Sequence, residues 1–247
     1  MAILKTSVAL SLCLFQGVAG ELNPTVTQFS DDITFHVDFD AGNGVPTLSG
    51  GTARPAKAVG NLSFCKGLFG QALQSGNLSY DAAGALDLSS PGTVIAWIAP
   101  CKGWDAKLDK SGFLFFLGKT DQWQLLIGRQ AGIATIYTYF QRVSKAICLR
   151  GCRADSQTWP VGQWHMVAVS WSPDALSLSV DGQRFAHLNL AMSIGRRTTG
   201  FVVGNLYGDF PLLVDELVIL NRRITDAEAE KAYRDTLKAA GAPRSGK

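Results

Sequence analysis

Hydrophobic and polar residues alternate with a period of two along much of the chain. Residues 33–40 show this pattern most clearly, because every second residue is apolar. The apolar positions are Ile33, Phe35, Val37 and Phe39. The polar positions between them are Thr34, His36, Asp38 and Asp40. Alternate residues of a strand point to opposite faces, so this segment is predicted to be a strand with one buried face.

Further short strands are predicted along the rest of the chain, separated by turn residues such as those at positions 90–92 and 172–174. Asp181 and Gly182 form a hairpin signal between two of these strands. The predicted strands are residues 93–98, 113–117, 122–127, 133–140, 164–171, 175–180, 184–188, 201–203 and 212–220. Many short strands at this spacing predict an all-β sandwich or barrel in a single domain.

One helix is predicted near the end of the chain. Thr225 and Glu228 have the spacing of a capping box, and Gly241 followed by Pro243 marks the end of the helix. The apolar residues of this segment recur every four positions, at Ala229, Tyr233 and Leu237. Such a narrow apolar stripe predicts a helix that lies on the surface of the sandwich.

Composition excludes several classes of protein. The chain has 247 residues, of which 47% are hydrophobic and 17% charged, and a formal net charge of +3. Disordered chains have low hydrophobicity and high net charge, and collagens and coiled coils have a compositional period that is absent here. The small net charge also argues against a dedicated nucleic-acid-binding protein.

Residues 1–20 have the pattern of a secretory signal peptide. Lys5 precedes a short apolar run, and small residues lead to a predicted cleavage site after Gly20. The apolar run is shorter than a membrane span requires, and no later segment approaches that length. We therefore expect a domain at residues 21–241 with a flexible tail at 242–247. The expected location is extracellular, or the periplasm or cell surface if the source is bacterial.

Cleavage would leave four cysteines in an oxidising compartment, where disulfides are expected. Three pairings are possible, and the local one joins Cys148 to Cys152 and leaves Cys65 with Cys101. A zinc site is the alternative reading, but no pair of histidines follows the close cysteine pair at the spacing of a zinc finger.

Six segments in one order resemble the laminin G-like family of the concanavalin A-like lectin/glucanase superfamily. They are VDFDAG at 37–42, FGQAL at 69–73, GTVIAWIAP at 92–100, WHMVAVSW at 164–171, LSLSVDGQ at 176–183 and VDELVILNRRIT at 214–225. The resemblance implies a jelly-roll β-sandwich of two antiparallel sheets. It does not imply one function, because this fold carries lectins, adhesion modules, hydrolases and structural domains.

Catalytic patterns are weak. Polysaccharide hydrolases of this fold place two or three carboxylates at alternating positions of one strand. Asp38 and Asp40 alternate without a third acid, and Asp215 and Glu216 are adjacent. A lyase set of Tyr, His and Arg is present only as scattered residues, and the Gly-x-Ser-x-Gly elbow of serine hydrolases is absent from the sequence.

A structural calcium ion is expected near the first and last core strands, since calcium prefers carboxylate and carbonyl oxygens from irregular loops. The predicted ligands are Asp40 and Asp215. The resemblance also implies calcium here, because similar modules often hold it near these two elements. The alternative is that Asp40 caps a turn and that Asp215 accepts hydrogen bonds from loop amides.

Residues 102–111 and 141–162 are longer than hairpin turns require, and long loops on a rigid sandwich are common recognition sites. Aromatic rings in loops suit carbohydrate, whose C–H groups pack on flat ring faces. The predicted ligand-binding residues are Trp104, Trp159, Tyr207, Asp209 and Phe210. Basic residues around the cysteine loop, Arg142, Lys145, Arg150 and Arg153, would suit a polyanion or serve only as a solvated surface.

The sequence therefore predicts a secreted, non-catalytic binding module with an extracellular carbohydrate as its ligand. A protein-interaction or structural module of the extracellular surface is the alternative. An enzyme that degrades polysaccharides on the same fold is the third reading.

Overall fold

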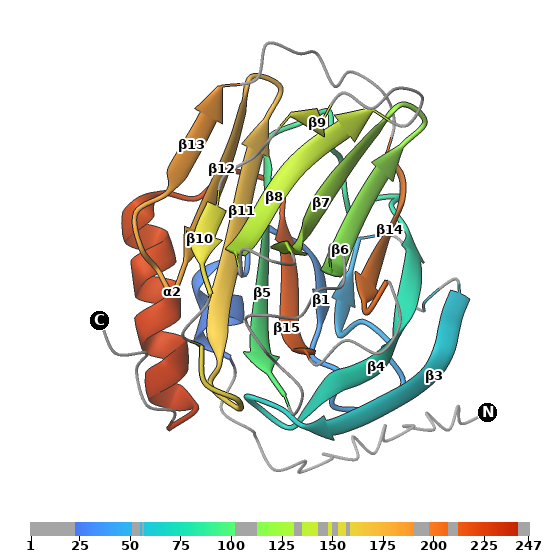
Figure 1. The fold of residues 1–247 in the computed structure, drawn as a ribbon, viewed down its shortest axis with the longest axis vertical. Coiled ribbons are helices and arrows are strands. Elements are labelled where there is room, and N and C mark those ends of the chain that lie inside the picture. The colour runs from blue at the N-terminus through green and yellow to red at the C-terminus, as the bar shows by residue number, and fades with distance from the viewer. Residues whose placement is uncertain are drawn as a thin grey trace, which may run out of the picture.

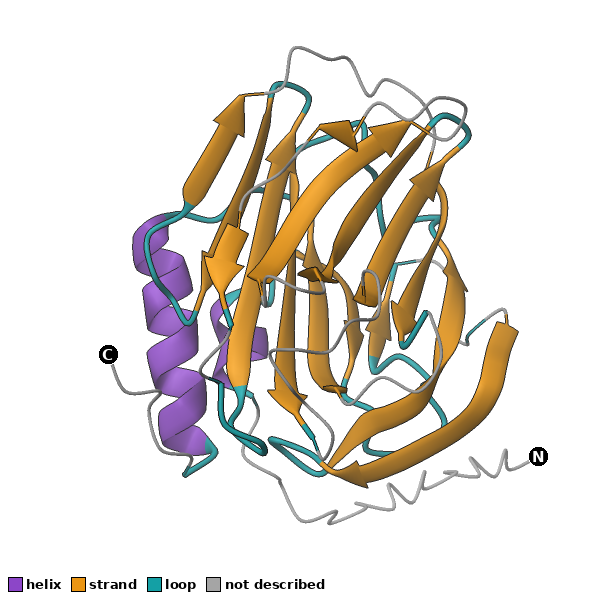
Figure 2. Ribbon diagram, viewed as in Figure 1, coloured by secondary structure: helices purple, strands orange, loops and turns teal. Residues whose placement is uncertain are grey.

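The computed structural model describes residues 23–50, 55, 57–101, 113–130, 135–142, 148–149, 153–156, 159–189, 198–206 and 212–241. Strands dominate these residues, and one longer helix follows them (Figures 1 and 2). The elements are α1 (Pro24–Gln28), β1 (Ile33–Val37), β2 (Leu48–Ser49), β3 (Lys57–Lys66), β4 (Gln71–Asp81), β5 (Gly92–Pro100), β6 (Phe113–Thr120), β7 (Trp123–Gln130), β8 (Thr135–Arg142), β9 (Cys148–Leu149), β10 (Arg153–Asp155), β11 (His165–Ser172), β12 (Ala175–Val180), β13 (Ala186–Asn189), β14 (Thr198–Gly204), β15 (Leu212–Leu220) and α2 (Asp226–Ala239).

The strands form one antiparallel ladder that curls into two facing layers. Its order is β10-β8-β7-β6-β14-β4-β15-β5-β11-β12-β13, and β1 and β3 pair with β15 and β4 beside this path. In Figure 1, β6, β7 and β8 cross in front of β5, β15 and β1. The predicted all-β sandwich of antiparallel strands is therefore confirmed.

The main core fills the space between the two layers. Aromatic rings from β1, β4 and β14 meet there: the Phe35 ring lies 4.9 Å from the Tyr80 ring and 5.0 Å from the Phe201 ring. Both of these contacts are edge-to-face, and Tyr80 stacks on Phe201 with centroids 5.1 Å apart. Aromatic pairs in these geometries contribute beyond the area they bury, so this cluster joins the layers strongly.

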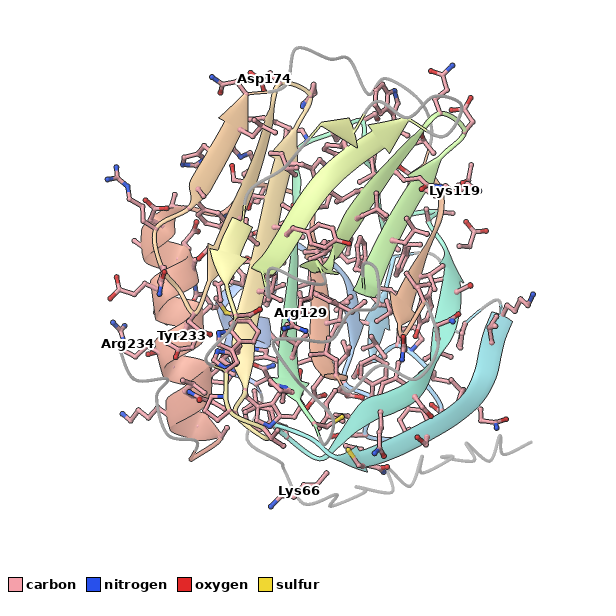
Figure 3. The ribbon with its side chains drawn as sticks, in the orientation of Figure 1. Lys66, Lys119, Arg129, Asp174, Tyr233 and Arg234 are labelled. Carbon is pink, nitrogen blue, oxygen red and sulfur yellow. The ribbon has the colours of Figure 1, made fainter. Side chains whose placement is uncertain are left out.

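A second core lies between the outer face of β5, β11 and β15 and the two helices. Tyr233 of α2 stacks on Trp97 of β5 with ring centroids 5.8 Å apart, and Figure 3 shows Tyr233 on the helix. The predicted stripe is confirmed, because Ala229, Tyr233 and Leu237 are all buried. Helix α2 therefore lies on the sandwich surface, as its sequence indicates.

The caps of α2 are as predicted. The Thr225 hydroxyl accepts the N–H of Glu228, and the Glu228 side chain reaches back to the N–H of Thr225. Gly241 follows the helix with φ of +62°. Glycine adopts this left-handed conformation without steric penalty, which explains the stop after α2.

The first strand departs from simple alternation. Phe35, Val37 and Phe39 enter the main core as predicted, but Ile33 packs against the second core beneath the helices. The pairing of β1 with β15 shifts register between Ile33 and Phe35. A bulge of this kind changes the face on which a side chain lies, which a strict period of two does not anticipate.

The hairpin at Asp181 and Gly182 is confirmed, since both residues have positive φ, 54° and 66°. This combination belongs to the tight turns that match strand twist. None of the helices among the described residues is long and apolar enough to span a membrane.

Candidate functional site

Three loop segments that the sequence singles out leave the sandwich at the same place, the end of β5. The N–H of Gly162 donates to the carbonyl oxygen of Pro100 at 2.7 Å. Leu212, the first residue of β15, pairs with Pro100 from the other side. Residues 102–112 follow this strand end, residues 207–211 precede Leu212, and Trp159 lies three residues before Gly162. The structure therefore brings together the starting points of the predicted binding loops.

The strands that flank two of these loop segments are also neighbours. Residues 102–112 lead from β5 to β6, and residues 207–211 lead from β14 to β15. Strand β5 pairs with β15, and β6 pairs with β14. The segment 102–112 therefore begins beside the strand where the segment 207–211 ends, and it ends beside the strand where that segment begins. Trp104, Tyr207, Asp209 and Phe210 themselves lie outside the described residues.

Trp159 is the predicted ligand residue that the structure describes. It is half-buried, and its indole ring lies parallel to the imidazole of His165, with centroids 3.8 Å apart and an interplanar angle of 6°. It also packs against the main core. One face of this ring is therefore supported by the protein, and its position is fixed by packing.

The imidazole beneath Trp159 is itself held firmly. His165 Nδ1 lies 2.7 Å from Asp181 Oδ2, and the N–H of Met166 donates to Asp181 Oδ1 at 3.0 Å. His165 is buried, and its Nε2 has no hydrogen-bond partner within the described ranges. The hairpin turn at Asp181 thus orients His165, and His165 supports Trp159.

Val161 is a surface feature of this end that the sequence reasoning missed. Its exposed fraction of 59% is the largest among the described large hydrophobic residues that are exposed. It stands between Pro160 and Gly162, next to the hydrogen bond that fixes this segment to β5. In the sequence, the only indication that Val161 belongs to this surface is its position in a predicted loop, two residues after Trp159. An exposed apolar side chain here extends the apolar surface available to a ligand.

The two predicted calcium ligands are brought together on either side of one turn. Asp215 Oδ2 accepts the N–H groups of Leu68 and Phe69 at 2.8 and 3.4 Å, and its Oδ1 accepts the N–H of Glu216 at 2.8 Å. Asp40 Oδ1 accepts the N–H of Gln71 at 2.7 Å. The two carboxylates therefore hold the turn between β3 and β4.

Burial raises the pKa of the Asp215 carboxyl well above its usual range, and the nearby charge of Glu216 raises it further. Backbone hydrogen bonds act in the opposite direction. Within the described ranges, no group of three or more His, Cys, Asp or Glu side chains is arranged to hold a metal ion. The amide contacts fit the turn-stabilising alternative, and calcium at Asp40 and Asp215 stays a prediction.

Cys65 and Cys101 are free thiols and half-buried in the structure. Burial raises the pKa of both thiols, and the neighbouring Cys65 raises that of Cys101 further. The predicted disulfide between them is not formed here and stays a prediction. Cys152 and the side chain of Cys148 lie outside the described residues, and the pairing of these two is a prediction also.

Comparisons with solved structures show the same architecture. Domain 4 of AbnA, an extracellular GH43 arabinanase from Geobacillus stearothermophilus solved in complex with arabinotriose, matches with a TM-score of 0.59 and 19% identity over 82% of this chain and 98% of its own. The ligand-binding domain of botulinum neurotoxin serotype D in complex with N-acetylneuraminic acid matches with a TM-score of 0.63 and 12% identity over 85% of this chain.

A third structure is the binding domain of botulinum neurotoxin DC in complex with rat synaptotagmin II. It matches with a TM-score of 0.65 and 10% identity over 84% of this chain. This chain spans 52% of the length of each of the two neurotoxin domains. At these identities the likeness shows the fold. No curated protein matches the sequence.

A family model matches the sequence directly, over residues 74–230. That range contains the strands from within β4 to β15 and the start of α2, and therefore most of the sandwich. The match agrees with the resemblance carried by the six sequence segments. The chain belongs to the Laminin_G_3 family of the concanavalin A-like lectin/glucanases superfamily.

Proposed function

We propose that this protein is a secreted, non-catalytic module that binds extracellular carbohydrate at the end of the sandwich where β5 ends. The observation that carries the proposal is the meeting of three loop segments at Pro100. Aromatic side chains are concentrated in these segments: Trp104, Trp159, Tyr207 and Phe210. Carbohydrate sites need rigid aromatic faces beside polar groups, and Asp209 provides a carboxylate within the same set.

The comparisons support this ligand class. Two structures of the same fold are in complex with sugars, arabinotriose in one and N-acetylneuraminic acid in the other. The support is at the level of ligand class, because fold alone does not specify a ligand. Loops on a rigid scaffold are where such folds vary their specificity. The particular sugar is therefore left to a binding screen.

The experiment is a binding screen of the purified protein against a broad panel of glycans and polysaccharides. Alanine variants at Trp104, Trp159 and Tyr207 test the loop end, and Val161→Ala tests the exposed neighbour. Leu48→Ala is the matched control, because Leu48 is an exposed apolar residue on β2, away from β5. We expect the loop variants to lose binding and the control to keep it. Folding of each variant is checked by thermal melting.

A protein ligand is the second candidate function. One structure of the same fold is in complex with a protein, rat synaptotagmin II. If no glycan binds and the protein is folded, the loop end is a protein-interaction surface or part of a structural module. Turnover of a polysaccharide that is lost on changing Asp38, Asp40 or Asp209 would instead indicate an enzyme.

A further inference from the structure

A cavity of about 510 Å³ lies beside β1, between the outer face of the sheet and the helices. Strand β1, the bulged part of β15, helix α1 and the end of α2 all contribute to its walls. It is lined by Asn23, Val26, His36, Asp38, Asp40, Thr47, Phe69, Gly70, Glu216 and Ala239. It shares only Asp40 with the proposed calcium position and none of its lining with the carbohydrate loops.

The walls of the cavity carry negative charge. Asp38, Asp40 and Glu216 contribute three carboxylates, and the described lining contains no lysine or arginine. Ala239 is the last residue of α2, and the carbonyl groups at a helix C-terminus carry partial negative charge. Burial raises the pKa of the Asp40 carboxyl, a hydrogen bond from Gln71 lowers it, and repulsion from Asp38 and Glu216 raises it again. The charge of His36, which also lines the cavity, lowers this pKa. The three carboxylates of the described lining therefore face a single histidine as their positive partner.

Three polar side chains of the lining already contact its carboxylates. The Thr47 hydroxyl donates to Asp38 Oδ2 at 2.6 Å, and the Asn23 amide donates to Glu216 Oε2 at 2.6 Å. His36 Nε2 also lies 2.8 Å from Glu216 Oε2. The six carboxylate oxygens of Asp38, Asp40 and Glu216 outnumber these contacts, so the cavity offers a ligand acceptor oxygens.

Glu216 is the clearest of these acceptors. Only 4% of its side chain is exposed, and both of its contacts are to Oε2. Its Oε1 accepts no hydrogen bond from the part of the chain that the structure describes. Oε1 is not one of the fully enclosed polar atoms that lack a partner, so it stays open to the cavity, where a donor from a ligand can reach it.

The backbone fixes Glu216 in this position. The pairing of β15 with β5 shifts register between Asp215 and Val218, and Glu216 has φ of +49°. A residue other than glycine rarely holds such a conformation unless surrounding contacts enforce it. The bulge thus presents the Glu216 carboxylate to the cavity, and Asn23 and His36 keep it there.

The lining fits an organic cation better than a metal ion. Among the described residues, the acids and His36 are not arranged as a metal-binding group. Val26, Phe69 and Ala239 give the cavity apolar walls between its carboxylates. An alkylammonium group matches both properties, since it donates three hydrogen bonds and its chain buries apolar area.

We propose that this cavity binds an aliphatic amine, whose ammonium group donates to Glu216 Oε1 and is held by the charge of Asp38 and Asp40. The site is independent of the carbohydrate loops, so its test does not depend on sugar binding. The ligand class is a primary amine on an apolar chain, of which 1,5-diaminopentane is a simple representative.

The test is calorimetric titration of the full protein with 1,5-diaminopentane, with 1,5-pentanediol as the uncharged probe of similar length. We expect the diamine to bind and the diol to fail, and we expect high salt to weaken the diamine. Glu216→Gln and Asp40→Asn should each weaken binding, with about a tenfold or larger loss for Glu216→Gln because a charge-assisted hydrogen bond is removed. Asp174→Asn is the control, because Asp174 lies at the far end of the molecule (Figure 3).

Unfolding of Glu216→Gln would be seen in its melting curve, and Asp40→Asn then carries the test alone. Equal binding of diamine and diol would overturn the proposal, as would diamine binding that neither variant weakens. Displacement of the diamine by calcium at equimolar concentration would also overturn it, since it would make the cavity a metal site.

Discussion

The indole ring of Trp159 lies parallel to the imidazole ring of His165, and His165 is held in turn by Asp181. Trp159 is a loop residue, yet its orientation is set by a strand residue and a hairpin turn on another part of the chain. A ring that is fixed before a ligand arrives loses little conformational freedom on binding. This contact is what makes Trp159 suitable as a platform for a sugar ring.

Trp159→Ala should lower stability by about 1–2 kcal/mol, because the ring is half-buried and stacked. For a chain of this size such a loss corresponds to a melting temperature lower by roughly 2–8 °C. Trp159→Phe should keep most of the stacking and part of the sugar binding. Thermal melting and glycan binding measured on both variants check this prediction. Full sugar binding by Trp159→Ala would remove Trp159 from the site.

The N-terminal cap of α2 should contribute measurably to stability. Thr225→Ala removes the hydroxyl that accepts the N–H of Glu228, and loss of such a cap costs about 1 kcal/mol. Urea unfolding measures the change. Lys231→Ala is the matched helix variant, because it removes only exposed contacts, the ion pair with Asp235 and a hydrogen bond of 3.4 Å to Gln28. It should leave stability nearly unchanged. Equal effects of the two variants would show that the cap has no special role.

Lowering the pH should reduce the free energy of unfolding, in part through protonation of Glu228. Hydrogen bonds from Arg222 hold the pKa of the Glu228 carboxyl below its usual range, against the effect of burial, and Thr225 lowers it further. The ionised carboxylate therefore stabilises the folded state above the unfolded-state pKa of about 4.3, and this contribution is lost as pH falls through the lower folded-state pKa.

Glu228→Gln should consequently flatten the fall in unfolding free energy between about pH 5 and pH 3. Urea unfolding over this range measures the slope. Glu230→Gln is the control, since Glu230 is an exposed residue of the same helix. A slope that both variants change equally would assign the effect to the net charge of the helix.

Removal of divalent metal should have little effect on the turn between β3 and β4. The carboxylates of Asp40 and Asp215 already accept backbone N–H groups of that turn. We therefore expect melting temperatures in chelator and in millimolar calcium to agree within about 1 °C, a difference well below that of a tightly bound ligand. A calcium-dependent rise that Asp40→Asn abolishes would instead identify these residues as calcium ligands.

Much of the sandwich could be predicted because its central strands are apolar. β12 and β15 have the predicted bounds, and the capping box placed the start of α2 correctly. β3 and β4 were missed because they are polar and contain Gly60 and Gly76, both at positive φ. An edge strand and its neighbour need few apolar residues, so a hydrophobic pattern does not reveal them.

Helix α1 was missed for a different reason. Asn23 caps it and Pro24 takes its first position, which is a readable signal, but five residues are too few to show a helical period. The residues around it matter for the amine cavity. His36 and Asp38 stood on the predicted polar face of the first strand, whereas Glu216 reaches the cavity through a bulge that no sequence period shows.

Strand β3 has one further consequence, because it borders the ladder and pairs only with β4 among the described strands. An open edge of ten residues could recruit a strand from a second molecule. Lys57 and Lys66 stand at its two ends, Lys66 projecting into solvent (Figure 3), and its register is interrupted between Val59 and Ser63. Charge and irregularity of this kind discourage sheet extension, so the protein should remain monodisperse at high concentration despite its long uncovered edge.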